Sequence, residues 1–82
     1  MVDILYFAWV RERIGTGRET IETVPVTVAD LITDLSHRSE GHAAAFADPS
    51  QLRVAVDQEL VPMDTLLKTP REIAIFPPMT GG

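Results

Sequence analysis

The chain has 82 residues, with 12 acidic against 7 basic side chains, a net charge of −5 and no cysteine. A chain of this length forms one domain with a small core, and a conventional enzyme pocket of roughly 300–1,000 Å³ is difficult to enclose in it. The negative charge argues against nucleic acid as a partner, and the lack of cysteine excludes disulfides and thiolate chemistry. A carrier or binding module is therefore favoured over a stand-alone enzyme.

The start of the sequence shows no targeting signal. Residues 1–3 lack the positive charge and the long apolar stretch of a secretory signal. The longest uncharged apolar run, residues 4–10, is far shorter than the roughly 20 residues that a membrane helix needs. We therefore expect a cytoplasmic protein that does not contact membranes.

The first third of the chain is predicted to form two strands. Residues 2–10 are rich in β-branched and aromatic side chains and precede the polar residues 11–13, so they are predicted as one long strand. Both faces of this strand are apolar, which is typical of the centre of a sheet. Residues 15–17 are predicted as a turn, and residues 20–22 as a weaker strand that Pro25 ends. The two strands are expected to form a hairpin.

A helix is predicted to begin after Thr27, because a hydroxyl residue three positions before Asp30 has the pattern of an N-terminal cap. Apolar residues then recur at i, i+3, i+4 and i+7 and form one stripe for packing: Val28, Leu31, Ile32 and Leu35. Gly41 is available to end this helix. Residues 42–47 are expected to add a short helical turn before Pro49.

Three further strands are predicted, over residues 52–56, 59–61 and 72–76, with a turn at residues 57–58. The predicted order is strand, strand, helix, strand, short strand, strand. This is the layout of an α+β, ubiquitin-like β-grasp fold over residues 1–76, in which one main helix packs on one face of a mixed sheet. The sheet residues expected beneath the helix are Ile4, Tyr6, Ile73 and Ile75.

The other face of this sheet is a candidate contact surface. Phe7 and Trp9 lie on the odd-numbered side of the first predicted strand, and Phe76 lies in the same phase on the last one. Leu60 is expected to join them. If the helix covers only the opposite face, these residues form an exposed apolar patch, and such patches often mark partner sites. The alternative is that loops cover them, or that they are isolated exposed residues without a role.

The last six residues have a composition that does not suit a core. They are Pro77, Pro78, Met79, Thr80, Gly81 and Gly82. The two prolines stop the sheet and stiffen the chain as it leaves, and six extended residues reach about 20 Å at most. Glycines at the tip have no Cβ to collide with a narrow channel, although chain ends also tolerate glycine without a function. We expect a flexible tail that places the Gly82 carboxylate inside a partner.

Other candidate sites are weaker. His37 and His42 lack a third ligand at a useful spacing, so no metal site is predicted. Residues 15–17 are not followed by the lysine or helix of a phosphate-binding loop. Arg11 lies in a charged cluster that is either solvated or a minor docking contact.

Four segments resemble the small subunit of molybdopterin synthase, the MoaD family: residues 7–12, 27–31, 54–61 and 72–82. In that family an activating enzyme related to those of ubiquitin uses ATP to adenylate the terminal glycine, and a sulfur-supplying enzyme then allows a thiocarboxylate to form. The large subunit uses this sulfur to build the dithiolene of molybdopterin from a cyclic pterin phosphate. Residues 68–71 depart from the acidic turn that is usual in the family.

The resemblance implies roles for particular residues. Gly82 would carry the sulfur, and Gly81 would fit the partner's channel. The large subunit would be contacted by Phe7, Leu60, Phe76, Pro77, Pro78, Met79 and Thr80. The chain would be a non-catalytic sulfur donor that binds no cofactor or metal, because the large subunit carries the active site.

Two alternatives remain open. One is a sulfur carrier of another pathway, such as that of thiamine, whose proteins also end in two glycines but are usually shorter and lack the Phe-Pro-Pro spacer. The other is a ubiquitin-like protein modifier or a simple interaction module. The single lysine, Lys68, argues against lysine-linked chains of the protein on itself.

Overall fold

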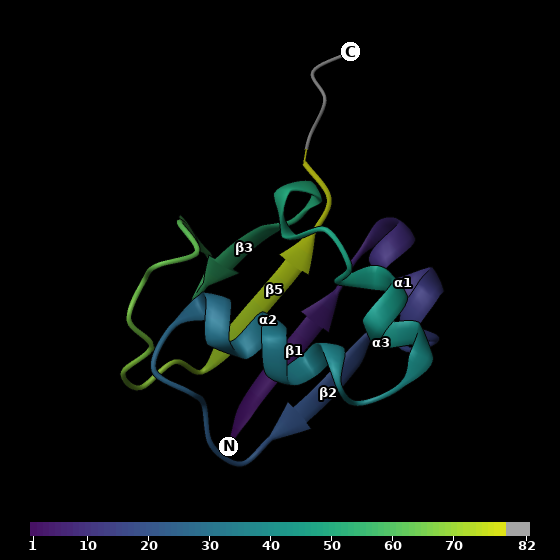
Figure 1. Cartoon of the computed structure of the whole chain (residues 1–82). Coiled ribbons are helices and arrows are strands. Elements are labelled where there is room, and N and C mark those ends of the chain that lie inside the picture. The colour runs from purple at the N-terminus through teal and green to yellow at the C-terminus, as the bar shows by residue number, and fades with distance from the viewer. Residues whose placement is uncertain (79–82) are drawn as a thin grey trace.

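The computed structural model describes residues 1–78, and a five-stranded mixed sheet forms its centre (Figure 1). The strands are β1 (Val2–Tyr6), β2 (Arg18–Ile21), β3 (Arg53–Val56), β4 (Glu59–Val61) and β5 (Glu72–Phe76). They are arranged in the order β2-β1-β5-β3-β4. The central pair, β1 and β5, is parallel, and the other neighbouring pairs are antiparallel. The predicted β-grasp fold is confirmed.

The main helix is α2 (Val28–Ser36), and it begins as the sequence predicts. Thr27 is the N-cap, and its hydroxyl oxygen accepts a hydrogen bond from the backbone N–H of Asp30 at 3.1 Å. All four residues of the apolar stripe are buried. Within residues 1–78, none of the helices has the length and apolar character needed to cross a membrane.

The stripe of α2 and the central strands share one core. Ile4 pairs with Ile73, and Tyr6 pairs with Ile75, across the parallel β1–β5 register. These side chains are no more than 1% exposed and belong to the same buried cluster as the stripe of α2. The predicted packing of this helix on this face is therefore confirmed.

The first predicted strand is wrong in its second half. β1 ends at Tyr6, and Ala8–Ile14 forms a helix, α1. Val10 is fully buried from this helix, and Arg13 lies over the ring of Trp9 at 4.9 Å, which is the i, i+4 contact of a helix. A short run of consecutive apolar residues fits the two-residue repeat of a strand as well as the 3.6-residue repeat of a helix, so the sequence pattern could not distinguish them. Trp9 is consequently not on the open face of the sheet but packs partly buried against the core.

Gly41 does not end α2, as the sequence analysis expected. The helix ends at Ser36, its C-cap residue His37 has a right-handed conformation, and Gly41 lies inside a further helix, α3 (Glu40–Ala45). A Cβ atom on Gly41 would lie 2.4 Å from the carbonyl oxygen of Arg13. Glycine is therefore needed here for the close approach of α3 to α1. The short helical turn expected at residues 42–47 exists but begins two residues earlier, at Glu40, and Pro49–Gln51 forms a 3-10 turn, η1.

The turn between β3 and β4 is tied to the start of β5. Asp57 and Gln58 both have positive φ angles, 50° and 71°, as a tight two-residue hairpin turn requires. One carboxylate oxygen of Asp57 accepts the backbone N–H groups of Arg71 and Glu72, at 2.9 and 3.0 Å. The segment at residues 68–71, which departs from the family pattern, is thus held at its last residue, Arg71, by the carboxylate of Asp57.

A network of polar side chains joins β1, β2 and α3. The Tyr6 hydroxyl donates to Glu19 at 2.8 Å, and the same carboxylate oxygen lies 2.5 Å from Nε2 of His42. Arg38 donates to the other oxygen of Glu19 at 3.0 Å, and the hydroxyl of Ser39 lies 2.7 Å from Nδ1 of His42. Burial alone would raise the pKa of Glu19, but the hydrogen bonds from His42 and Tyr6 outweigh it and hold the pKa below its ordinary value.

Truncation of the central helix residue tests the core. Leu31→Ala should lower the free energy of unfolding by about 2–5 kcal/mol, because it removes a fully buried side chain. Asp34→Ala, on the exposed side of the same helix, is the control and should change it by less than about 0.5 kcal/mol. Urea unfolding measures both, and equal small losses would contradict the placement of α2.

Acid titration tests the polar network. Since the folded-state pKa of Glu19 is lowered from 4.5, its ionised form stabilises the fold above pH 4.5, and this contribution is lost as pH falls through the lower folded value. Glu19→Gln should therefore be less stable at neutral pH and should lose less stability on acidification than the native chain. The exposed Glu22→Gln is the control, and urea midpoints from pH 3 to 7 provide the comparison. Parallel curves for native and Glu19→Gln proteins would show that the network contributes nothing.

Candidate functional site

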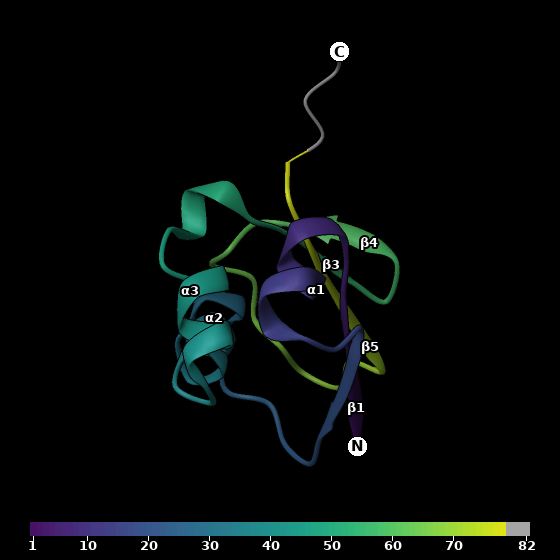
Figure 2. The same ribbon diagram turned by 90° about the vertical axis from the view of Figure 1, so that its right-hand side faces the viewer.

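The helices lie on one side of the sheet, and within residues 1–78 the other side carries no helix (Figure 2). We call this side the open face. Its central row crosses four strands, because the registers place Leu5 beside Ala74, Ala74 beside Ala55, and Ala55 beside Leu60. Leu60, on the edge strand β4, is 64% exposed. The row is apolar throughout, and its two central alanines make the middle of the face shallow.

Phenylalanines form one end of the open face. The backbone N–H of Phe7 donates to the carbonyl oxygen of Ile75 at 3.2 Å, which continues the parallel register and places Phe7 beside Phe76. Phe7 is 47% exposed, although it is a large apolar residue. Arg53 is the partner of Phe76 on β3. The structure thus brings together the three predicted contact residues of the folded domain, Phe7, Leu60 and Phe76, on one face.

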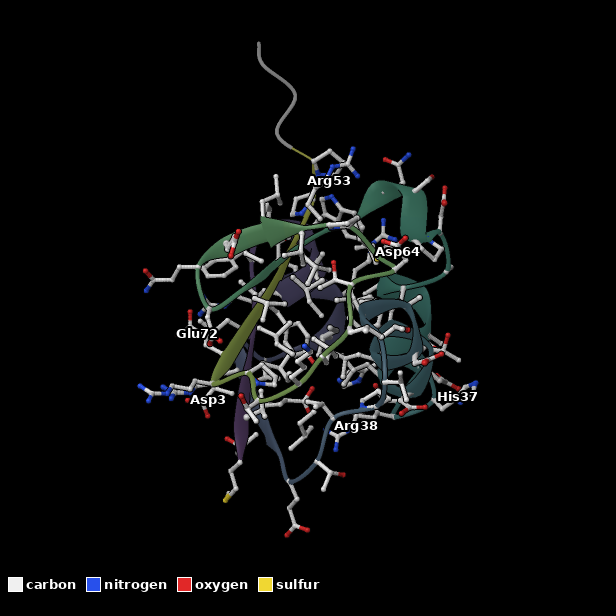
Figure 3. The ribbon with its side chains drawn as sticks, turned by 90° about the vertical axis from the view of Figure 1, so that its left-hand side faces the viewer. Asp3, His37, Arg38, Arg53, Asp64 and Glu72 are labelled. Carbon is white, nitrogen blue, oxygen red and sulfur yellow. The ribbon has the colours of Figure 1, made fainter. Side chains whose placement is uncertain are left out.

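The opposite end of the open face is polar. The carboxylate of Asp3 accepts hydrogen bonds from Arg18, at 2.5 Å, and from the hydroxyl of Thr20, at 3.1 Å. These two bonds lower the pKa of Asp3, and the bond from Arg18 has the larger effect. Figure 3 shows Asp3 and Glu72 well away from Arg53, which lies at the end of the sheet where β5 finishes. The face therefore carries the two phenylalanines near the end of β5, with Arg53 beside Phe76, and the Asp3–Arg18 pair near its beginning.

The chain leaves the sheet at the phenylalanine end of this face. β5 ends at Phe76, and Pro77 and Pro78 follow it partly buried and outside any strand. The predicted tail therefore starts directly beside the two phenylalanines. Met79, Thr80, Gly81 and Gly82 lie outside the described residues, so their roles remain predictions.

Two features of this region were missed from the sequence. Ala55 and Ala74 also belong to the open face, and the alternation of the strands could have identified them, because each lies between inward-facing neighbours. The buried partners of Glu19 had no sequence signal, because they are 13 and 23 residues away from it. Among residues 1–78, no three His, Cys, Asp or Glu side chains are grouped as a metal site.

Chemically, this arrangement suits docking and delivery. An apolar face binds a partner through burial of its phenylalanines and leucines, and a terminus that begins at its edge can enter a cleft of that partner. The covalent chemistry available to such a terminus is that of a carboxylate.

Comparison with known proteins identifies close relatives. A family model, described as the ThiS family, matches residues 4–82. Molybdopterin synthase sulfur carrier subunits of Escherichia coli and Haemophilus influenzae are 39% and 35% identical, and each match covers all of this chain and all of the relative. A protein of the same name from Mycosarcoma maydis is 36% identical over 87 residues, covering 99% of this chain and 92% of the relative.

Solved structures show the same fold. A putative molybdopterin converting factor, subunit 1, from Pyrococcus furiosus superposes with a TM-score of 0.73 and 28% identity, covering 95% of this chain and 97% of that one. SAMP1 from Haloferax volcanii superposes with a TM-score of 0.71 over 99% of this chain and 98% of that one. At 21% identity, the second similarity supports the fold alone.

Proposed function

The chain belongs to the ThiS family and is a sulfur carrier of molybdenum cofactor biosynthesis, and we propose that Gly82 carries the sulfur as a C-terminal thiocarboxylate. The relatives named as molybdopterin synthase sulfur carrier subunits support this assignment. The structural observation that carries the proposal is the open face, whose phenylalanine end lies where the chain leaves β5 for the tail.

Activation of the terminus is the first step of the proposal. A carboxylate is a poor electrophile, so a partner adenylyltransferase uses ATP to form an acyl-adenylate on Gly82, with release of pyrophosphate. A sulfur nucleophile, supplied by a further enzyme, then displaces AMP and leaves the thiocarboxylate. The chain itself binds no cofactor in this scheme, and its use of ATP through a partner fits a cytoplasmic location.

Transfer of the sulfur is the second step. The large subunit of molybdopterin synthase binds the open face through Phe7, Leu60 and Phe76, and holds the cyclic pterin phosphate that receives the sulfur. Pro77 and Pro78 direct the chain from this face into the large subunit. Met79 and Thr80 contact the walls of its channel, and Gly81 passes the narrowest part because it has no Cβ. The large subunit catalyses the reaction, and this chain supplies the reacting sulfur.

Charge substitution on the open face tests the docking step. Phe7→Asp or Phe76→Asp should weaken binding to the large subunit by at least about 30-fold, because a carboxylate must then be buried in an apolar interface. Leu66→Asp is the matched control, since Leu66 is also exposed, at 60%, but lies in the loop before β5. Calorimetric titration measures the affinity, and thermal unfolding measures stability. These rings would not be a docking contact if Leu66→Asp lost as much affinity. The same would follow if the phenylalanine variants lost thermal stability to the same extent as affinity.

Changes in tail length test the terminus. Deletion of Gly82, or addition of one residue after it, moves the carboxylate by about 3.5 Å, and displacements of 1 Å can cost about 100-fold in a positioned reaction. Binding to the large subunit should survive, while molybdopterin formation should fall by at least that factor. One residue added before Met1 is the control, because the parallel β1–β5 pairing places the N-terminus at the far end of the sheet.

Molybdopterin formation is measured with the large subunit, the activating enzyme, ATP and a sulfur source. If the extended chain supplied sulfur as well as the native chain, the carrier role of Gly82 would be wrong. An interaction module would then be the better account.

A further inference from the structure

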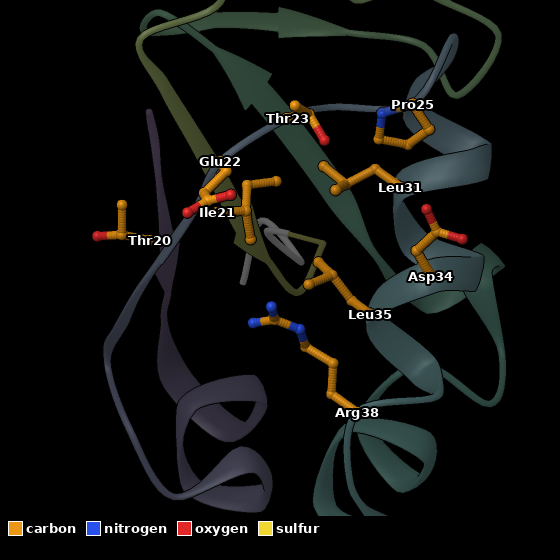
Figure 4. A pocket seen from close by; sticks show the side chains of 9 residues that line it. All are labelled: Thr20, Ile21, Glu22, Thr23, Pro25, Leu31, Asp34, Leu35 and Arg38. Atoms are coloured by element: carbon orange, nitrogen blue, oxygen red, sulfur yellow. The ribbon is translucent and has the colours of Figure 1, made fainter.

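A groove of about 380 Å³ lies between β2 and α2, on the helix side of the sheet (Figure 4). The side chains of Ile21, Leu31 and Leu35 line its inner wall from the two elements, but Leu31 and Leu35 are only 1% exposed, so Ile21, at 9%, is the one that keeps some accessible apolar surface. The remaining lining residues are Thr20, Glu22, Thr23, Pro25, Asp34 and Arg38. Apart from Thr20, whose hydroxyl bonds to Asp3 on the open face, the lining lies on the helix side of the sheet, so the groove is not part of the docking surface described above.

The backbone beside this groove is an open sheet edge. β2 is the first strand in the sheet order and, among the described residues, pairs only with β1. The N–H of Tyr6 donates to the carbonyl oxygen of Gly17 at 3.0 Å. Because hydrogen-bonded and non-bonded pairs alternate along an antiparallel ladder, the N–H and C=O groups of Arg18 and Thr20 point away from β1.

These two outward-facing residues differ in one respect. The hydroxyl of Thr16 donates to the carbonyl oxygen of Arg18 at 3.2 Å and accepts its N–H at 3.5 Å, so this end of the edge is already occupied. Within residues 1–78 no such side chain covers the N–H and C=O of Thr20. The free part of the edge is therefore the part that lines the groove.

The charges around the groove favour a basic occupant. Glu22 and Asp34 lie on its two sides, and neither forms an ion pair with another described residue. The charge of Arg38 is already paired, because its guanidinium donates to Glu19 at 3.0 Å. The unpaired charge at the rim is thus negative, which disfavours a second copy of this acidic chain, whose net charge is −5.

We propose that this groove binds an extended segment of a partner protein, which adds as a strand to β2. Its backbone pairs with Thr20, an aliphatic side chain contacts Ile21, and a lysine or arginine beside it faces Glu22 and Asp34. Strand addition of this kind takes its affinity from backbone hydrogen bonds, and the two carboxylates select a basic segment.

This site goes beyond the sulfur-carrier function and does not depend on it. β2 and β4 are the two opposite edges of the sheet, so a segment on β2 lies far from Leu60 and from the start of the tail. A partner can therefore hold the carrier by this groove while the open face and the tail are engaged elsewhere.

The test uses a defined probe, the acetylated and amidated peptide Lys-Ile-Val-Ile-Lys, titrated into the ¹⁵N-labelled full chain. The amide resonances of residues 18–23 and 31–38 should shift, and those of Leu5, Ala55, Ala74 and Leu60 should not. The same peptide N-methylated at its three central residues should bind at least about tenfold more weakly, because its backbone cannot donate to Thr20.

Variants of the chain test the two parts of the site. Thr20→Pro removes the outward N–H without touching the β1 pairing, and should weaken the peptide about tenfold relative to Thr20→Val, which removes only the hydroxyl. Asp34→Lys should also weaken binding, while Glu12→Lys, which changes net charge equally but lies on α1, should not. Thermal unfolding confirms that each variant is folded.

Several results would overturn the proposal. These are the absence of shifts at millimolar peptide, shifts confined to the open face, equal binding of the N-methylated peptide, and equal effects of Asp34→Lys and Glu12→Lys. Shifts of residues 18–23 that depend on protein concentration without peptide would show instead that β2 pairs with a second copy of the chain.

Discussion

The parallel pairing of β1 with β5 determines most of the other features of this protein. It places the two ends of the described chain at opposite ends of the sheet and brings Ile4 against Ile73 and Tyr6 against Ile75 in the core. The same pairing, continued by one residue, sets Phe7 beside Phe76 on the other face. The tail therefore begins at the phenylalanine end of the open face because β1 and β5 run in the same direction. A fold with these strands antiparallel would separate Phe7 from the terminus.

The small size of the chain explains why one face stays open. The helices α1, α2 and α3 are short and cover a single side of the sheet. An uncovered apolar face exposes hydrophobic surface to water in the free protein, but it can be buried when a partner binds. The protein keeps this cost low by placing alanines at the centre of the face and large side chains, Leu60 and Phe7, at its margins. The polar end, where Asp3 is bonded to Arg18, limits the extent of the apolar area.

The sequence predicted those elements in which apolar residues repeat with a spacing that fits only a helix or only a strand. The stripe of α2 and the alternation of β5 gave correct elements because each pattern fits only one geometry. The run at residues 4–10 fits both a strand and a helix, so α1 was missed and Trp9 was assigned to the wrong face. The need for glycine at position 41 arises from its contact with Arg13, which no local pattern records. The network around Glu19 likewise depends on residues that only the tertiary fold brings together.

For the candidate site, phase along the strands was enough to group Phe7 with Phe76, although they are distant in sequence, and Leu60, which was expected to join them, lies on the same face. The central claim is that the terminal carboxylate beyond this face carries the sulfur. The most direct measurement is mass spectrometry of the native chain after incubation with its activating enzyme, ATP and a sulfur source. Trypsin should release residues 72–82, since Arg71 precedes Glu72. The account predicts one oxygen replaced by sulfur, localised by fragmentation to Gly82. An unmodified C-terminal peptide, or sulfur located at any other residue, would contradict it.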